Sequence, residues 1–212
     1  MIVLSHRGLW KQPNEKNTEI SFRRSFESNF GTETDIRDYC GELVISHDIA
    51  DSACMPLSEF FQIYNSYSKQ LPLGLNIKAD GLQEKLILEL KKFNIKNYFV
   101  FDMSVPDGLV YIKAGLNTFT RQSEYELNPA FYGPSKGVWL DEFSAHWINE
   151  MTVTGHLNNG KDICIVSPEL HKRPIQFEWD NYKKFSKKNK SLSKIMICTD
   201  FPEEAERKFN ED

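Results

Sequence analysis

The stretch "GTETDIRDYCGELVISHD" (31–48) combines a strand-like run with a concentration of ionisable side chains. Glu33 and Asp35 lie two residues apart, and in a β-strand such residues share one face because side chains alternate. The part that follows, "CGELVISHD", is typical of a short hairpin extension that ends at His47 and Asp48. The sequence therefore predicts a strand with two carboxylates on one face and a histidine returning beside them.

Short apolar runs of this kind recur along the whole chain. They are bounded by Gly, Pro, Asn or Lys and are rich in β-branched or aromatic residues, which is typical of strands. Eight such runs cover residues 1–5, 31–36, 71–78, 97–102, 117–121, 137–141, 162–167 and 194–200.

Helical patterns lie between several of these runs. Predicted helices cover residues 17–29, 81–93, 178–188 and 202–209. The segments 103–116 and 143–160 are weakly patterned, and we expect irregular or degraded helices there. Strands that alternate with helices favour an α/β fold with parallel pairing. The number of predicted strands, eight, favours a small closed barrel with the helices outside. Because no linker or repeat is visible, residues 1–212 are predicted to form one domain.

Composition and charge restrict the class of protein. The chain has 212 residues, 40% of them hydrophobic and 26% charged, which excludes a disordered or fibrous protein. The net charge of −4 gives no general attraction to nucleic acid, and we expect no nucleic-acid partner. The locally basic run 182–194 is interpreted as a solvated helix face rather than a phosphate or lipid patch.

Targeting features are not visible in the sequence. The N-terminus "MIVLSHRG" lacks the pattern of a signal peptide, and no run is long enough for a membrane span. The four cysteines form no CxxC pair, so we expect reduced thiols and a cytoplasmic protein. The oligomeric state stays open.

The ends of the predicted strands carry most of the candidate site residues, as expected for a barrel of this type. In chain order these residues are His6 and Arg7, Glu33 and Asp35, His47 and Asp48, Asn76 and Lys78, Asp102, Arg121, Asp141 and Glu142, and Thr199 and Asp200.

Two carboxylates on one inward face are unfavourable unless a cation neutralises them. The oxygens of Glu33 and Asp35, with the amide carbonyl of Asn76, suit a hard cation, Mg²⁺ or Ca²⁺. Arg7 and Lys78 add positive charge at the same rim. The set therefore predicts a site for an anion, most naturally a phosphate.

Two histidines complete the candidate site. His6 and His47 lie on adjacent predicted strands, where one can accept a proton and the other donate one on opposite sides of a phosphate. Asp102, Arg121 and Asp141 are further candidates for substrate contact. Charged residues at strand ends also form salt-bridge networks, and that alternative stays open for these three.

Six sequence blocks occur in a recognisable order. "SHRG" (5–8), "NT" and "SF" (17–22), "TETDIR" (32–37), "LVISHD" (43–48), "LNIK" (75–78) and "ICTDFPEEA" (197–205) resemble the signature blocks of the glycerophosphodiester phosphodiesterase family, which is related to the phosphatidylinositol-specific phospholipases C. The resemblance extends from residue 5 to residue 205 and implies a TIM (β/α)8 barrel.

The resemblance also implies roles for individual residues. The matching positions are His6 and His47 as the catalytic histidines, Arg7 as the phosphate contact, Glu33 and Asp35 as metal ligands, and Lys78 as the lysine two positions after the third ligand. Asn76 departs from the family, which usually has Glu there and in some branches Asp. Lys16 departs as well, because it replaces the Glu of the family's Pro-Glu-Asn-Thr block.

The expected activity is that of a metal-dependent phosphodiesterase acting on a small, glycerophosphodiester-like substrate. Two alternatives stay open: a metal-independent lyase similar to phospholipase C, and a non-catalytic protein that binds a phosphorylated ligand. The sequence leaves open whether water or a neighbouring hydroxyl attacks the phosphate, and which alcohols flank it.

Overall fold

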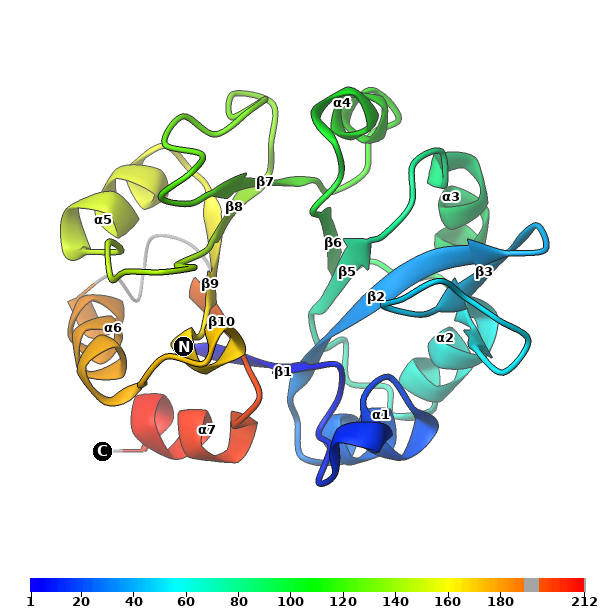
Figure 1. The fold of residues 1–212 in the computed structure, drawn as a ribbon, viewed down its shortest axis with the longest axis horizontal. Coiled ribbons are helices and arrows are strands. Elements are labelled where there is room, and N and C mark those ends of the chain that lie inside the picture. Colours follow the sequence, from blue (N-terminus) through cyan, green and yellow to red (C-terminus); the bar gives the residue numbers. More distant parts are fainter. Residues whose placement is uncertain (189–194, 212) are drawn as a thin grey trace.

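The computed structural model describes residues 1–188 and 195–211. Eight parallel strands form a ring with helices on its outside (Figure 1). The strands of the ring are β1 (Ile2–His6), β2 (Gly31–Tyr39), β5 (Leu73–Ile77), β6 (Tyr98–Phe101), β7 (Phe119–Gln122), β8 (Gly137–Leu140), β9 (Asp162–Val166) and β10 (Ile195–Thr199). Each corresponds to one predicted strand, and the α/β fold is confirmed. Residues 189–194 of the basic run, and hence the first residue of the last predicted strand, lie outside the described residues.

Strand pairing runs almost completely around the ring. Parallel ladders connect β7 through β8, β9, β10, β1, β2 and β5 to β6. The two ends of this sheet, β6 and β7, meet only through an isolated bridge between Val100 and Thr118 in the described part of the chain. The backbone N–H of Val100 donates to the carbonyl of Asn117 at 2.8 Å. The ring is therefore joined less firmly at this position than elsewhere.

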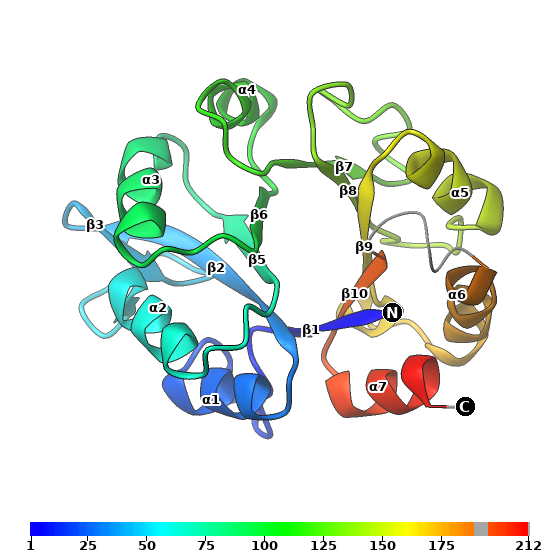
Figure 2. The ribbon, with the colours of Figure 1, turned by 180° about the vertical axis from the view of Figure 1, so that it is seen from behind.

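The helices surround the strands in both views of the ring (Figure 2). They are α1 (Glu19–Glu27), α2 (Leu57–Ser66), α3 (Gln83–Lys92), α4 (Val105–Lys113), α5 (Glu150–Asn158), α6 (Gln176–Lys188) and α7 (Pro202–Asn210), with short 3₁₀ turns η1 (Pro13–Glu15) and η2 (Pro168–His171). The expectation of irregular structure in 103–116 and 143–160 was wrong for α4 and α5, which are regular, short helices. Their N-caps are Ser104 and Asn149, whose side chains each accept a backbone N–H of the first turn.

The hairpin predicted after the second strand is present. β3 (Glu42–Ile45) runs antiparallel to the outer half of β2 and is followed by the short β4 (Met55–Pro56). The N–H of Ser46 donates to the carbonyl of Asp35 at 3.1 Å. The loop that starts at Ser46 therefore begins beside the carboxyl end of the barrel strands.

An aromatic cluster fills the interior of the barrel. Phe101 stacks on Trp139 with ring centroids 3.9 Å apart, and Phe99 stacks on Phe119 at 4.1 Å. Arg121 follows Phe119 by two residues and therefore shares its face of β7. The same alternation carries His6 on β1 above the buried Leu4. The polar end of the barrel thus rests on a packed apolar layer.

None of the described helices has the length and hydrophobicity that a membrane span requires. All four cysteines are free, and Cys164 and Cys198 are buried in the barrel.

Candidate active site

The turn after β1 positions His6 and Arg7. Arg7 and Gly8 both have left-handed backbone conformations, with φ of 60° and 84°. A Cβ at Gly8 would overlap the side chain of Ser21 on α1, so only glycine fits the turn without rearrangement. The N–H of Arg7 donates to the carbonyl of Glu33 at 2.9 Å, and the Ser21 hydroxyl donates to the Arg7 carbonyl at 3.2 Å. The turn is thus tied to both β2 and α1.

The three predicted cation ligands come from neighbouring strands. Asp35 of β2 and Asn76 of β5 are paired directly in register, and Glu33 pairs with His6 of β1. All three ligand candidates are buried. Glu33 Oε2, Asp35 Oδ1 and Asn76 Oδ1 accept no hydrogen bond from the described residues. Buried oxygens rarely lack a partner, so this arrangement fits an oxygen-binding cation.

Positive charge surrounds Asp35. Arg7 Nε lies 2.9 Å from Asp35 Oδ2, and Lys78 Nζ lies 3.5 Å from Asp35 Oδ1. The side-chain amide of Asn17 donates to Asp35 Oδ2 at 2.8 Å. Burial, with the neighbouring charge of Asp35, raises the pKa of Glu33 to about 7. The charges of Arg7 and Lys78 therefore do not fully compensate the two buried carboxylates. A divalent cation would supply the additional positive charge.

Asp200 at the end of β10 orients His6. Asp200 Oδ1 lies 2.6 Å from His6 Nδ1, and His6 Nε2 lies 3.9 Å from Glu33 Oε2. Burial alone would raise the pKa of Asp200, but the hydrogen bond with His6 and the charges of His6 and Lys16 hold it below its usual value. Because the ionised Asp200 contacts His6 at Nδ1, the other ring nitrogen of His6, Nε2, faces the Glu33 carboxylate. The N–H of Asp200 in turn donates to the partly buried Glu169 carboxylate at 3.0 Å.

His47 lies on the loop after β3 and is half-exposed, with Nδ1 2.9 Å from Asp48 Oδ1. In the described structure it makes no hydrogen bond or ion pair with His6 or with the ligand candidates. It lines a cavity of about 560 Å³ together with Arg7, Lys16 and Asn17. The two predicted catalytic histidines therefore approach the site differently, His6 from within the barrel and His47 from its rim.

The three candidates for substrate contact already have ionic partners. Asp102 bridges Lys78 Nζ at 3.5 Å and Arg121 at 2.6 Å, which links both residues to the site. Asp141 instead pairs with His171 Nε2 at 2.6 Å. In this structure, Asp102, Arg121 and Asp141 therefore form salt bridges, which is the alternative to substrate contact that the sequence left open.

A second acidic cluster lies beside the barrel, where one ligand-type atom each of Glu142, His146 and Glu178 lies within 4.8 Å of the others. The buried Glu142 carboxylate accepts two backbone N–H groups at 2.7 Å each and the Tyr182 hydroxyl at 2.9 Å. Arg173 pairs with both glutamates. Because a metal ion here would have to displace Arg173, we assign this cluster to packing of the helical layer.

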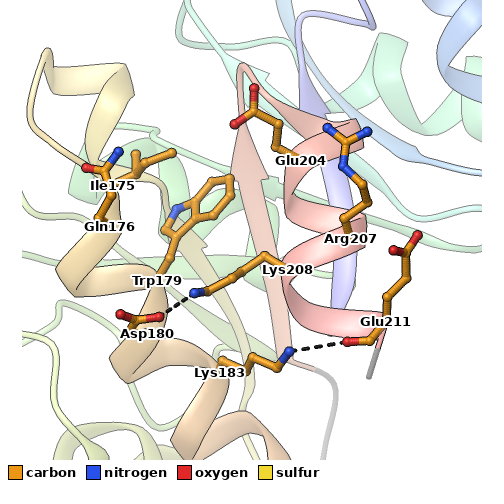
Figure 3. Close-up of a pocket in the computed structure, with 9 residues that line it drawn as sticks. All are labelled: Ile175, Gln176, Trp179, Asp180, Lys183, Glu204, Arg207, Lys208 and Glu211. Carbon is orange, nitrogen blue, oxygen red and sulfur yellow. Dashed lines mark hydrogen bonds and ion pairs between the residues drawn. The ribbon is translucent and has the colours of Figure 1, made fainter.

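A larger groove of about 630 Å³ lies between α6 and α7 on the outside of the barrel (Figure 3). Lys208 pairs with Asp180, and Lys183 donates to the backbone carbonyl of Glu211. Charged side chains of this groove thus interact with one another.

Sequence reasoning missed several residues that organise the site. Asn17 was placed at the start of the predicted helix 17–29 without a role in the site, yet it precedes α1 and its side-chain amide donates to Asp35. Asp200 was noted at a strand end without a role, and Glu169 and His171 were not noted. Asn17 lies in the "NT" block and Asp200 in the "ICTDFPEEA" block, so these two residues could have been recognised from the sequence.

Comparison with known proteins rests on structure. No protein-family model and no curated protein matches this chain. Similar solved structures include three that cover at least 95% of this chain. A candidate glycerophosphodiester phosphodiesterase from Galdieria sulphuraria has a TM-score of 0.72 at 20% identity and covers 96% of this chain and 95% of its own.

The other two are a glycerophosphodiester phosphodiesterase from Agrobacterium tumefaciens, with a TM-score of 0.64 at 11% identity, and a glycerophosphoryl diester phosphodiesterase from Parabacteroides distasonis, with 0.64 at 12%. They cover 95% and 98% of this chain and 97% and 85% of their own chains, respectively. The chain therefore has the TIM-barrel fold of these three structures.

Proposed function

We propose that this protein is a divalent-cation-dependent phosphodiesterase of the glycerophosphodiester phosphodiesterase family. The observation that carries the proposal is the set of three buried oxygens on Glu33, Asp35 and Asn76, at the carboxyl end of the barrel, that accept no hydrogen bond from the described residues. The shared fold and the six sequence blocks support it independently.

Glu33, Asp35 and Asn76 would hold Mg²⁺ or Ca²⁺, since all three offer oxygen. When bound, such a cation stabilises the negative charge that develops on a phosphate under attack. Arg7 and Lys78 lie beside the Asp35 carboxylate and bind the non-bridging phosphate oxygens. The arrangement favours a phosphate group because the cations concentrate at one point of the barrel mouth.

His6 and His47 carry the proton transfers. One accepts the proton of the attacking oxygen, and the other donates a proton to the leaving alkoxide. If water attacks, the products are an alcohol and a phosphomonoester. If a hydroxyl of the substrate attacks, a cyclic phosphate forms first.

Three further assignments belong to the proposal. Asp102, Arg121 and Asp141 contact the substrate after exchanging their present ionic partners. Residues 1–212 act as one domain, supported by the parallel pairing of β1 with β10. The free thiols support a cytoplasmic location.

The test is hydrolysis of bis(p-nitrophenyl) phosphate with EDTA and with added Mg²⁺ or Ca²⁺. Activity should require the cation, and His6→Ala and His47→Ala should each lower turnover about 10²–10⁴-fold. His146→Gln serves as the matched control and should retain turnover, because this histidine pairs with Glu142 and with none of the proposed catalytic residues or cation ligands. Thermal unfolding of each variant checks that the fold is intact.

Several outcomes would contradict the proposal. A variant of His6 or His47 that keeps more than about half of the activity removes that histidine from the mechanism. Turnover that persists in EDTA favours the metal-independent lyase. Phosphate binding without turnover of any diester favours the binding protein.

A further inference from the structure

Most of the large apolar side chains that are exposed in the described residues follow the carboxyl ends of barrel strands. Ile49 is 88% exposed in the loop that follows the β2–β3 hairpin, and Leu127 is 70% exposed in the loop after β7. Others lie in the corresponding loops or in the first residues of the next helix, namely Val105, Tyr125, Phe177 and Phe201. Because such loops of a parallel barrel lie at one end, these side chains gather at the end that carries the candidate active site.

Two contacts relate this apolar set to the mouth of the barrel. The loop of Ile49 begins at Ser46, whose N–H donates to the carbonyl of Asp35 at 3.1 Å. The carbonyl of Leu127 accepts from the side chain of Gln122, the last residue of β7, at 3.0 Å. β2 and β7 are separated by two strands of the ring on one side and by four on the other. Ile49 and Leu127 therefore flank the mouth from well-separated positions.

Unpaired positive charge accompanies the apolar side chains. Lys11 lies in the loop after β1, and Lys172 ends η2 after β9 with a left-handed φ of 59°. Both are exposed, and neither ammonium group has an ion pair among the described residues. Lys16, on the same side, lies over the ring of Trp10 at 4.4 Å but already pairs with Asp200 at 3.6 Å. Apolar groups interspersed with cations complement a surface that offers both acyl chains and phosphates.

We infer that the rim of the barrel mouth docks on a phospholipid bilayer, and that the scissile diester belongs to a lipid or lysolipid head group. The assignment of the substrate rests on the proposed function. The docking surface is inferred separately, from the exposed apolar side chains and the lysines of the rim. Because the apolar side chains are distributed around the mouth, they can all contact a partner only if that partner presents a broad surface, as a bilayer does. A lipid surface also presents a phosphate diester directly to Arg7 and Lys78, whereas a protein seated there would cover the cavity.

The test is co-sedimentation with vesicles of phosphatidylcholine, with and without phosphatidylglycerol. Ile49→Ser and Leu127→Ser should each lower the partition coefficient roughly three- to tenfold, because each removes one apolar side chain from the interface. Leu88→Ser is the matched control, since Leu88 is 65% exposed on α3, away from the strand ends, and should change nothing. Combined Lys11→Gln and Lys172→Gln should weaken binding to the phosphatidylglycerol vesicles more than to phosphatidylcholine alone.

The inference is overturned if the wild-type protein binds neither vesicle, or if Leu88→Ser weakens binding as much as the rim variants. It is also overturned if sedimentation velocity shows a dimer that dissociates in Ile49→Ser or Leu127→Ser, because the rim would then contact a second copy.

Failure of the docking and failure of the proposed chemistry give different results. Vesicle binding is measured in His6→Ala as well, so it does not depend on turnover. The rim variants should keep turnover of bis(p-nitrophenyl) phosphate and lose turnover of lysophosphatidylcholine embedded in vesicles. Equal rates of wild type and rim variants on the embedded lipid would overturn the assignment of the substrate class, while absence of turnover on both substrates would count against the proposed function alone.

Discussion

Asn76 leaves the candidate cation site with two carboxylates and one neutral amide. Because no described residue donates a hydrogen bond to its buried Oδ1, and because Asn76 lies in register with Asp35, a carboxylate at this position would join the ligand set. Asn76→Glu should lower the Mg²⁺ or Ca²⁺ concentration for half-maximal activity by about tenfold. Turnover should stay the same or fall, since the added charge lies near the incoming phosphate and competes for Lys78.

Titration calorimetry measures the binding of the metal independently of turnover. Asn76→Ala serves as the opposite control and should weaken binding. The same metal dependence in wild type and Asn76→Glu would show that Asn76 is not a ligand. The next residue to test would be Asp102, which the Lys78 ion pair already connects to the site.

His171 is the residue from which a pH dependence of stability follows. Its hydrogen bond with Asp141 raises the pKa of the imidazole above the ordinary 6.5. The folded state therefore holds a proton that the unfolded state releases, and the resulting stabilisation is complete below about pH 6.5 and is lost as pH rises through the raised pKa. The difference in unfolding free energy between wild type and His171→Gln should be larger at about pH 5.5 than at about pH 8.5.

Urea denaturation at the two pH values measures that difference. Asp141→Asn is the matched variant, because it removes the partner and should abolish the pH dependence contributed by His171. An equal effect of His171→Gln at both pH values would mean that the pair does not stabilise the charged imidazole.

At the scale of elements, the turn between β1 and α1 depends on Gly8 for two reasons. Its φ is left-handed, and a Cβ would overlap Ser21. Gly81 has nearly the same φ, 82°, but a Cβ there would meet nothing within 4 Å. Gly81→Ala should therefore destabilise the protein by about 1 kcal/mol, while Gly8→Ala should cost about 3 kcal/mol because the overlap is added.

Urea denaturation of the two variants separates the effect of backbone conformation from that of crowding. Similar losses in both would indicate that Ser21 moves aside without strain. Since Gly8 follows Arg7 directly, the crowded variant should also lose phosphodiesterase activity, and Gly81→Ala should not.

The elements that periodicity failed to predict have an identifiable cause. In α4, the outward side chains Val105, Leu109 and Val110 are themselves apolar, so the helix has little contrast between its faces. In α5, Met151 is exposed while His156 is buried, which reverses the usual pattern. An amphipathic stripe can be recognised only when solvent and core faces differ in polarity.

At the scale of the molecule, β6 and β7 are the neighbouring strands of the ring that are joined by the fewest backbone pairs in the described residues. An isolated bridge joins these strands, whereas four residue pairs join β1 to β10. Backbone amides in 117–122 should therefore exchange with deuterium about tenfold faster than those in 195–199. Hydrogen exchange followed by mass spectrometry checks this, and equal protection of the two segments would show that the ring opens as one unit.

The sequence alone determined the eight strands, the positions of Glu33, Asp35 and Asn76 on them and that of Lys78 directly after β5, because apolar runs and side-chain alternation are local properties. Only the tertiary structure decided which distant residues meet. Asp200 reaches His6 across 194 residues because β10 lies beside β1, and Asp141 turns to His171 rather than to the ligand candidates. Such contacts depend on the order of strands around the ring and on packing, neither of which a local pattern records.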